Sequence, residues 1–558
     1  MKNTVFTPLQ RFRRLLKIDQ KEISQVYFYA LFNGLVNLSL PLGIQAIVNL
    51  IQGGEITSSW IILVAFVIGG VALTGILQLL QLRIVENISQ KIFSRASFEF
   101  AYRIPKINYQ ALRDYYAPEL ANRFFDTMTI QKGLPKILID FSLALFQIIV
   151  GLVLLSFYHT FFIIFSLILI GLVYLIIAFT GPRGLKTSLE ESKYKYKIAF
   201  WLEEIARTKL SFKLVSDSDM NLSKSNYHVE NYLKAREGHF KILIQQSMYL
   251  IGFKVIIAAG LLITGSILVF NQEMNIGQFV AAEIIIILII ASVEKLIKSL
   301  DSIYDVLTGL EKIGYVSDMP LDQDEGLFIN ANTSEISVAV DNVSYRYDNS
   351  IKPTLANISF EVDADTSIYL TGPSNSGKST LLQILSGILT PTEGLVRFKG
   401  LPLQSLDLDG LRKHIGYALS NNDIFQGTIL ENITMERPQA TVERVIKALD
   451  ICGLNTFISS VPLGLKTLID PEGRKVPRNI QNRIILARAI ATNPKLLILE
   501  DPLDHVKTVE KKEIISKLTN SENSWNIIVS SVDEIWKEFI PNQLEIKDGK
   551  VISNSLKH

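Results

Sequence analysis

The sequence predicts an all-α domain of six membrane-spanning helices followed by an α/β domain, and three observations lead to this fold class. Long apolar runs with few charges occupy residues 24–298 of the 558-residue chain. Beyond residue 335, short β-rich runs alternate with polar loops. A glycine-rich pattern at 372–379 separates one such run from an apolar segment. The predicted organisation is a membrane domain at 1–315, a polar linker at 316–335 and the α/β domain at 336–558.

Six segments have the length and composition of a membrane span, which needs about 20 mostly apolar residues. The connections after the second and fourth segments exceed fifty residues and carry apolar residues at helical spacing. We therefore expect the helices of spans 2–5 to continue far beyond the membrane. The six predicted spans are 26–50, 60–82, 137–157, 161–179, 248–270 and 276–296.

The distribution of charge predicts the orientation of these spans. The short connections at 51–59, 158–160 and 271–275 contain no Lys or Arg, whereas the N-terminal tail and both long connections are rich in them. The positive-inside rule therefore places both termini and both long connections in the cytoplasm. A basic amphipathic stretch at 6–18 either lies on the inner membrane surface or forms a solvated tail.

The first span carries a stripe of amide side chains. Asn33, Asn37, Gln45 and Asn49 fall four or eight residues apart, so they share one face of a helix. Such a face meets either another helix or a substrate path, because amides in lipid need partners. Pro41 occupies the missing step, and it should kink the helix.

Two charged residues fall inside predicted spans 5 and 6. Lys254 and Glu283 differ in predicted depth by roughly 13 Å at about 1.5 Å per residue, so we do not expect them to pair. Intramembrane charge faces a cavity or a partner. Glu283 is the better candidate for a cavity, and a structural partner is the alternative.

The pattern GxxxxGK[ST] occurs at 372–379, after a strand-like run at 368–371 and before an apolar helix. This context is that of a P-loop, whose backbone amides wrap the phosphates of a nucleotide. Lys378 would neutralise the β- and γ-phosphates, and the Ser379 hydroxyl would bind Mg²⁺. The predicted ligands are ATP and Mg²⁺. The predicted nucleotide-binding residues of this loop are Gly372, Ser374, Asn375, Ser376, Gly377, Lys378, Ser379 and Thr380.

With six predicted spans followed by a P-loop domain, nearly the whole chain resembles the ABC exporters. Segments at 343–347, 391–400, 409–416, 424–433 and 483–489 match family segments in the family's order. The resemblance implies a half-transporter: a six-helix transmembrane domain of the ABC exporter type fused to one ATP-binding cassette. It also implies that Tyr347 stacks on the adenine.

The resemblance implies partners and a location. The expected partners are the lipid bilayer and a second half-transporter in a homodimer or heterodimer, and a periplasmic adaptor protein is a further candidate. The expected location is the inner membrane of a bacterium. A net charge of +2 gives no indication of nucleic acid, and none is expected. The single cysteine, Cys452, is interpreted as a buried apolar residue.

The chain departs from the family at positions that serve catalysis. The family's Asp-then-Glu pair is reversed, so by position Glu500 holds Mg²⁺ through water and Asp501 orients the attacking water. Ser420 occupies the glutamine position of the Q-loop, which adds it to Ser379 and Glu500 as a metal-site residue. Val532 occupies the position of the switch histidine.

The signature segment also departs from the family. It reads Val-Pro-Arg-Asn-Ile at 476–480, in place of LSGGQ. Pro477 has neither a hydroxyl nor an N–H with which to bind phosphate. We therefore expect ATP–Mg²⁺ binding with slow hydrolysis by an ABC-type ATPase with atypical motifs.

The leading functional hypothesis is export of a substrate that the sequence does not identify. The alternatives are a degenerate subunit of a heterodimer, a membrane regulator that senses ATP without transporting, and a P-loop enzyme with a membrane anchor. Six complete spans favour transport, whereas the altered catalytic positions favour a regulator.

Overall fold

The computed structural model describes residues 6–52, 58–113, 115–215, 217–322, 326–328, 336–348, 350–420 and 423–556. They form two compact units. The first comprises Met1–Ile107 and Tyr115–Pro320, and the second comprises Asn108–Asp114 and Leu321–His558. Of the predicted linker at 316–335, residues 323–325 and 329–335 lie outside the described residues, so the predicted domain limits stay a prediction.

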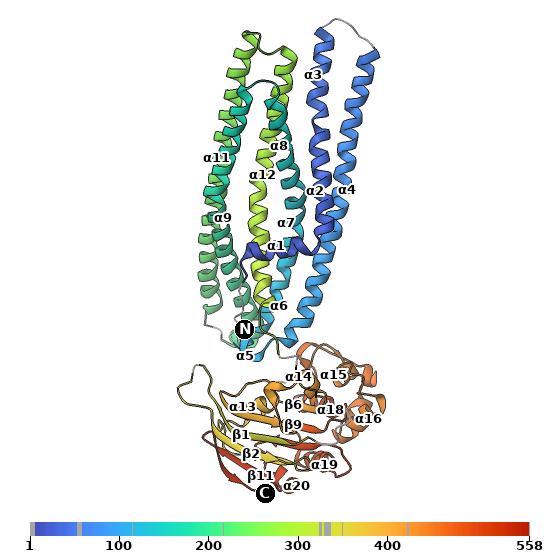
Figure 1. The fold of residues 1–558 in the computed structure, drawn as a ribbon. Helices are drawn as coiled ribbons and strands as arrows, with labels where there is room; N and C mark the ends of the chain where they lie inside the picture. Colours follow the sequence, from blue (N-terminus) through green and yellow to red (C-terminus); the bar gives the residue numbers. More distant parts are fainter. Residues whose placement is uncertain are drawn as a thin grey trace. The chain divides into compact units, whose positions relative to one another are not determined.

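The first unit is all-α (Figure 1). A 3₁₀ turn, Ile104–Lys106, follows α4, and a π-helical stretch, Lys136–Phe141, joins α7 to α8. The helices are α1 (Pro8–Ile18), α2 (Gln20–Asn37), α3 (Ser39–Gln52), α4 (Ser58–Arg103), α6 (Ala117–Asn122), α7 (Asp126–Pro135), α8 (Ser142–Ser156), α9 (Phe161–Arg207), α10 (Lys209–Leu214), α11 (Met220–Phe270) and α12 (Ile276–Ser317).

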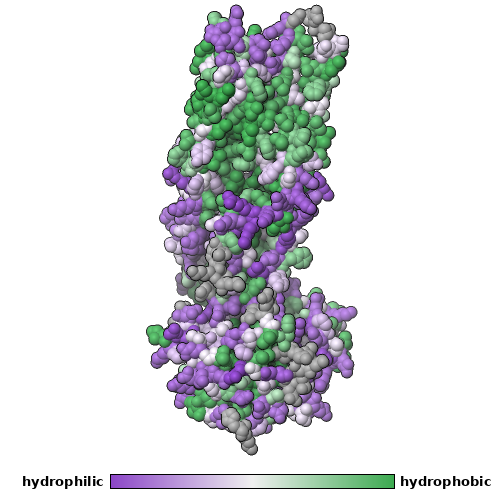
Figure 2. Space-filling view, in the orientation of Figure 1, coloured by the Kyte–Doolittle hydropathy of each residue, from purple (hydrophilic) through white to green (hydrophobic). Residues whose placement is uncertain are grey.

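Six helical segments in the described part of the chain are long and apolar enough to cross a membrane. Five predicted spans fall within these segments, and the other, 137–157, extends past the end of its segment by one residue, so the six-span prediction is confirmed. The 51-residue α11 is about 75 Å long at 1.5 Å per residue, more than twice the roughly 30 Å apolar core of a bilayer. On the face that Figure 2 shows, hydrophobic residues form a band across this unit between more hydrophilic ends. The six segments are Gln20–Gln52, Ser58–Lys106, Ala117–Ser156, Phe161–Arg207, Met220–Phe270 and Ile276–Ser317.

The helix α12 lies at the centre of this unit and packs against α3, α7, α8, α9 and α11. Its apolar side chains share one core with those of α8, α9 and α11. Glycines permit the close crossings: a Cβ on Gly184 of α9 would lie 2.4 Å from the ring of Tyr304, and one on Gly277 would lie 2.1 Å from Asn49 Oδ1. Backbones approach closely at such small residues.

The amide stripe of the first span makes contacts with other helices. Asn33 is fully buried and donates to the carbonyl of Thr74 on α4 (3.5 Å). Gln45 accepts a hydrogen bond from the hydroxyl of Tyr158 (2.6 Å), and Asn49 lies against Gly277, as described above. These contacts favour the helix–helix interpretation. The helix breaks at Leu38, between α2 and α3, three residues before Pro41, whose ring excludes a helical hydrogen bond.

Lys254 on α11 forms an ion pair with Glu294 on α12, and Lys298 binds the same carboxylate at 2.6 Å. Lys254 lies 17 residues before Asn271 and Glu294 lies 19 residues after Asn275, so the two are at similar depth along the hairpin. The predicted absence of a Lys254–Glu283 pair is confirmed. No described residue forms an ion pair with the half-buried Glu283.

The N-terminal helix α1 packs against α12 within the first unit. The guanidinium of Arg11 forms ion pairs with Asp318 (2.7 Å) and Glu311 (3.5 Å), both near the C-terminus of α12. The side chain of Arg11 is only 10% exposed, so these ion pairs hold α1 against the end of α12. The alternative of a freely solvated tail is therefore wrong for residues 8–18.

The second unit is an α/β domain built on two sheets. The antiparallel sheet has the order β2-β1-β4-β5, with β1 at Val338–Tyr345, β2 at Leu355–Val362, β4 at Glu393–Phe398 and β5 at Leu401–Pro402. The second sheet has the order β12-β11-β3-β10-β9-β6 and is parallel except for β12. Its strands are β3 (Ile368–Thr371), β6 (Ile415–Ala418), β9 (Leu496–Glu500), β10 (Asn526–Ser530), β11 (Gln543–Lys547) and β12 (Lys550–Asn554).

Helices cover this sheet (Figure 1), and the buried apolar residues of the unit form two large clusters. All five residues of β9 are buried, as expected for a central parallel strand covered on both faces. A short pair, β7 (Gly427–Thr428) and β8 (Leu468–Ile469), lies apart. The helices are α5 (Tyr109–Leu112), α13 (Lys378–Leu385), α14 (Leu408–Arg412), α15 (Ile429–Thr434), α16 (Val442–Ile451), α17 (Asn455–Ser460), α18 (Arg478–Ile490), α19 (Thr508–Leu518) and α20 (Trp536–Phe539).

The crossing at Gly184 gives the first prediction. Gly184→Ala should lower the thermal unfolding midpoint of the detergent-purified protein, because the buried Tyr304 ring is held by a hydrogen bond from Gln246 and overpacking costs about 1–3 kcal/mol. Gly171→Ala on the same helix is the matched control, since nothing lies within 4 Å of its added Cβ. Equal unfolding midpoints for the two variants would contradict the packing described here.

Candidate nucleotide-binding site

The glycine-rich loop at 372–377 joins β3 to α13, which is the strand–loop–helix context expected of a P-loop. Gly372 has a φ of +138°, and an added Cβ would lie 2.0 Å from the carbonyl oxygen of Ile546. Gly377 has a φ of +101°, and an added Cβ would lie 2.6 Å from Leu355 Cδ2. Both positions thus require glycine for backbone conformation as well as for space.

Lys378 begins α13 and reaches back across the loop. Its Nζ donates to the carbonyls of Gly372 (2.8 Å) and Pro373 (2.9 Å). Burial holds the pKa of Lys378 below its ordinary value, and the charges of Asp501 and Glu500 oppose that shift. The ammonium group therefore lies at the loop and interacts electrostatically with both carboxylates. A cation at this position would be suited to binding phosphate.

The other predicted loop residues divide by exposure. Ser374, Asn375 and Ser379 are exposed, whereas Ser376 and Thr380 are buried. The hydroxyl of Thr380 is 3.1 Å from that of Tyr347, which joins the predicted aromatic residue to the first turn of α13.

The ring of Tyr347 is held by two further side chains of the same unit. Tyr345 packs edge-on against it, with ring centroids 4.9 Å apart. The guanidinium of Arg113 lies 4.3 Å from its centroid, a cation–π contact. The structure thus places the aromatic side chain beside the loop that would hold the phosphates.

Four parallel strands bring the remaining site residues together. In the order β3-β10-β9-β6, all four strands end at one edge of the sheet. The loop at 372–377 follows β3, Ser531 follows β10, Glu500 ends β9, and Ser420 lies two residues after β6. Ligands of open α/β sheets bind outside the carboxyl ends of the strands.

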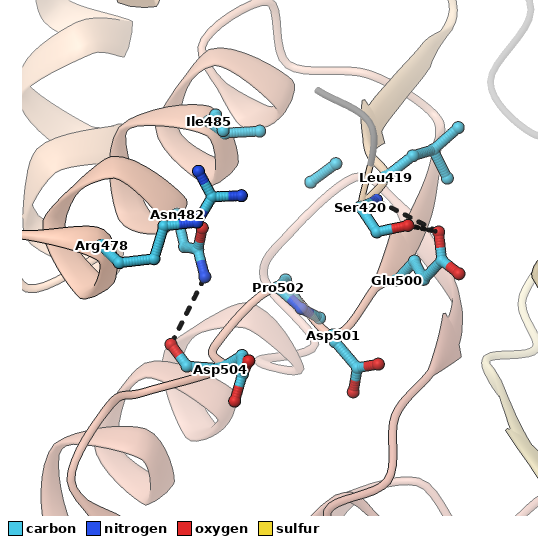
Figure 3. Close-up of a pocket in the computed structure, with 10 residues that line it drawn as sticks. Leu419, Ser420, Arg478, Asn482, Ile485, Glu500, Asp501, Pro502 and Asp504 are labelled. Atoms are coloured by element: carbon cyan, nitrogen blue, oxygen red, sulfur yellow. Dashed lines mark hydrogen bonds between the residues drawn. The ribbon is translucent and has the colours of Figure 1, made fainter. Parts of the chain in front are cut away.

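Glu500 and Ser420, two of the three predicted metal-site residues, are in direct contact (Figure 3). One oxygen of Glu500, Oε2, accepts hydrogen bonds from the hydroxyl of Ser420 (2.6 Å) and from its backbone N–H (3.1 Å). No described group donates to the other oxygen of Glu500. Mg²⁺ is a hard cation that binds oxygen ligands such as carboxylates and hydroxyls. The second carboxylate oxygen of Glu500 and the serine hydroxyls are ligands of this kind, so the residues present fit this ion.

Asp501 contacts the loop after β10. Its Oδ1 accepts hydrogen bonds from the Ser531 hydroxyl (2.9 Å) and from the Val532 N–H (3.0 Å). Val532 contributes only its backbone, as a side chain without polar atoms must. Ser531 was not among the predicted site residues, although a serine directly before the altered switch position is a signal in the sequence that points to it.

The altered signature segment forms the start of α18. Pro477 caps the helix, and Arg478 donates to Gln481 (3.0 Å). Gln481 in turn donates to the carbonyls of Gly473 and Val476, both at 2.8 Å. The conformation of this segment is therefore stabilised by hydrogen bonds from the side chains of Arg478 and Gln481.

A cavity of about 100 Å³ lies between this helix start and the acidic pair (Figure 3). Asn482 donates to the carbonyl of Asp504 across it (3.4 Å). Its lining residues are Ala418, Leu419, Ser420, Arg478, Asn482, Ile485, Glu500, Asp501, Pro502 and Asp504.

The fold and the site define a class of protein: a six-span membrane domain fused to a P-loop ATP-binding domain. The ABC transporter transmembrane region matches residues 26–293, and the ABC transporter domain matches residues 355–504. The chain belongs to the ABC transporter family, as a half-transporter with both domains in one chain. Its six long apolar helical segments make it a multi-pass membrane protein.

Relatives and a solved structure agree with this assignment. The chain is 29% identical over 296 residues to the leukotoxin translocation ATP-binding protein LktB of Pasteurella haemolytica-like sp. (strain 5943B), covering 50% of this chain and 42% of that one. It is 30% identical over 273 residues to the alpha-hemolysin translocation ATP-binding protein HlyB of Escherichia coli O157:H7, covering 49% and 38%. The match thus spans about two fifths of these curated relatives.

The fold is shared with a solved structure of a bacterial Atm1-family ABC exporter with ATP bound. The two superimpose with a TM-score of 0.85 at 17% identity, over 96% of each chain.

The Ser420–Glu500 contact gives the second prediction. Ser420→Ala removes one of the two hydrogen bonds that fix the Glu500 carboxylate, a loss worth about 1 kcal/mol. The Mg²⁺ concentration for half-maximal binding of a fluorescent ATP analogue should therefore rise about fivefold. Ser420→Thr keeps the hydroxyl and serves as the control, and binding in EDTA should be equal in all three proteins. An unchanged Mg²⁺ dependence for Ser420→Ala would remove Ser420 from the metal site.

Proposed function

We propose that this chain is one half of an ATP-driven exporter, in which ATP binding at the loop 372–380 drives rearrangement of the six-span domain. The single observation that carries the proposal is a fully formed P-loop site in the same chain as six membrane-spanning helices. Coupling requires that ATP bind one conformation of the protein more tightly than another. The cassette and both termini lie in the cytoplasm, and the membrane is the bacterial inner membrane.

Each site residue has a role in this proposal. Tyr347 stacks on adenine, and the backbone amides of the loop together with Lys378 hold the triphosphate. Ser379 and Glu500 hold Mg²⁺, with Ser420 fixing the Glu500 carboxylate. Asp501 orients the attacking water. When bound, Mg²⁺ supplies neutralisation of the charge that develops on the phosphates.

We further propose that hydrolysis is slow. Asp501 is one methylene shorter than the glutamate of the family, and misplacing a reacting group by about 1 Å can lower a rate on the order of 10²-fold. Val532 offers no side-chain hydrogen bond to a γ-phosphate. Pro477 offers no N–H in the signature segment, so two donors that would stabilise the transition state are missing.

The working unit is proposed to be a dimer of half-transporters, either two copies of this chain or one copy with a related chain. A homodimer is favoured because the membrane domain keeps all six spans and a packed core. A regulator that binds ATP without transporting is the second candidate, and the altered catalytic positions favour it.

An accessibility experiment separates the exporter from the regulator. Cys452 is the only cysteine, so Cys452→Ser gives a cysteine-free background. In it, Ile287→Cys places a thiol on the exposed side of α12, one turn from Glu283, and Leu167→Cys places one on the exposed side of α9. An exporter should change the rate at which a water-soluble maleimide labels position 287 when ATP–Mg²⁺ is added, because its cavity turns outward.

The controls fix the meaning of that result. Position 167, on α9 and exposed to a similar extent, is the comparison, and its labelling rate should stay the same with and without ATP. Lys378→Ala should abolish both binding of the ATP analogue and the change at position 287. ATP binding with no change at position 287 would favour the regulator, and no ATP binding by the unaltered protein would refute both functions.

Slow hydrolysis can be tested by restoring the family's residues. The double variant Asp501→Glu, Val532→His should raise kcat at least about tenfold, because it returns the longer carboxylate and a side-chain hydrogen bond to the γ-phosphate. ATP affinity should change little, since neither residue belongs to the P-loop. If the unaltered protein already hydrolyses ATP as fast as the double variant, the proposal of slow hydrolysis is wrong.

A further inference from the structure

Ser531 is a buried serine that no part of the P-loop pattern accounts for. It directly follows β10 and is 7% exposed. Its hydroxyl donates to Oδ1 of Asp501 (2.9 Å). The same hydroxyl oxygen accepts a hydrogen bond from the backbone N–H of Asp533 (3.1 Å). Because that N–H occupies a lone pair of the oxygen, the hydroxyl hydrogen is left to point at Asp501.

The position of this donor is itself fixed. The carboxylate of Asp533 forms an ion pair with Lys511 on α19 and accepts a hydrogen bond from the N–H of Ile535 (3.1 Å). The turn that carries Ser531 is therefore tied to α19. A chain of hydrogen bonds thus runs from the turn through the Ser531 hydroxyl to the carboxylate of Asp501.

Asp501 is held at both its backbone and its side chain. Its N–H donates to the carbonyl of Ser530 (2.8 Å), and its φ of +42° lies in the left-handed region, which non-glycine residues adopt rarely. Oδ1 receives both donors, Ser531 Oγ and Val532 N. No described group donates to Oδ2, so this oxygen is the one available to a water molecule.

We propose that Ser531 is a positioning residue for ATP hydrolysis: its hydroxyl fixes Oδ1 of Asp501 so that Oδ2 orients the attacking water. The side chain at 532 cannot supply such a bond, and the preceding residue supplies it instead. The inference rests on the proposed role of Asp501. In this proposal, the side-chain contact between the loop after β10 and Asp501 is made by a serine hydroxyl, which stays neutral at physiological pH.

The test uses the full-length protein in lipid nanodiscs and measures hydrolysis of radiolabelled ATP over hours, together with binding of a fluorescent ATP analogue. Ser531→Ala should lower kcat about 10- to 100-fold, because a carboxylate displaced by about 1 Å orients water poorly. KM and the affinity for the analogue should stay within about twofold, since Ser531 does not belong to the P-loop. Ser531→Thr should retain most of the activity because it keeps the hydroxyl.

Two controls separate positioning from a general structural effect. Ser386→Ala removes another buried hydroxyl, one that donates to the carbonyl of Leu382 (2.6 Å), and it should leave kcat unchanged. In an Asp501→Asn background, Ser531→Ala should lower kcat little further, because the two residues act as one unit. A structural role would instead lower kcat by the same factor in both backgrounds.

The outcomes distinguish this inference from the proposed function. If the unaltered protein hydrolyses ATP, Lys378→Ala does not, and Ser531→Ala matches the unaltered protein, the inference is wrong and the proposed function stands. Equal losses for Ser531→Ala and Ser531→Thr would also overturn it. If the unaltered protein binds ATP without hydrolysing it, both the inference and the hydrolytic part of the proposed function fail.

Discussion

The parallel pairing of β3, β10, β9 and β6 is the constraint on which the site depends. Parallel strands end at one edge, so four loops far apart in the sequence meet there. Without that register, the loops that carry Lys378, Glu500 and Ser531 would not lie close together. The strands can pair in this way because their apolar side chains are buried on both faces, as in β9. The chemistry of the site therefore rests on burial by residues that take no part in it.

The sequence was sufficient for features that depend on local pattern. Six apolar runs predicted the spans, and a strand, a glycine-rich loop and a helix predicted the P-loop, because each signal lies within a few dozen consecutive residues. The contact of Ser420 with Glu500 joins residues 80 positions apart, and that of Ser531 with Asp501 joins residues 30 apart. Such contacts follow from strand order and loop conformation, which no local pattern encodes. The positive φ of Asp501 is a further example, since no glycine or asparagine marks it.

In the membrane unit, too, the helices could be predicted from local sequence, whereas contacts between helices could not. Its helices follow from composition, but the partner of Lys254 follows from hairpin geometry. Similar distances from the loop put Glu294 beside Lys254, whereas Glu283 lies nearer the loop than Lys254 by about two and a half turns at 3.6 residues per turn. A charge in an apolar setting is costly unless paired. The Lys254–Glu294 pair therefore also fixes the register of α11 against α12, which composition alone left open.

The two acidic residues are each held by a serine from a neighbouring loop, and this arrangement bears on how the site is divided between binding and catalysis. A serine hydroxyl orients a carboxylate without adding charge, so the negative charges of Glu500 and Asp501 remain available to a cation and to Lys378. In the proposed function, metal and phosphate binding depend on that charge and on the loop, whose strand–loop–helix geometry the structure retains. The proposed rate of hydrolysis depends instead on where the second carboxylate oxygen of Asp501 lies, and the shorter side chain would displace it. If both roles hold, affinity for ATP–Mg²⁺ and turnover are separable in this chain, because different atoms of the same site determine them.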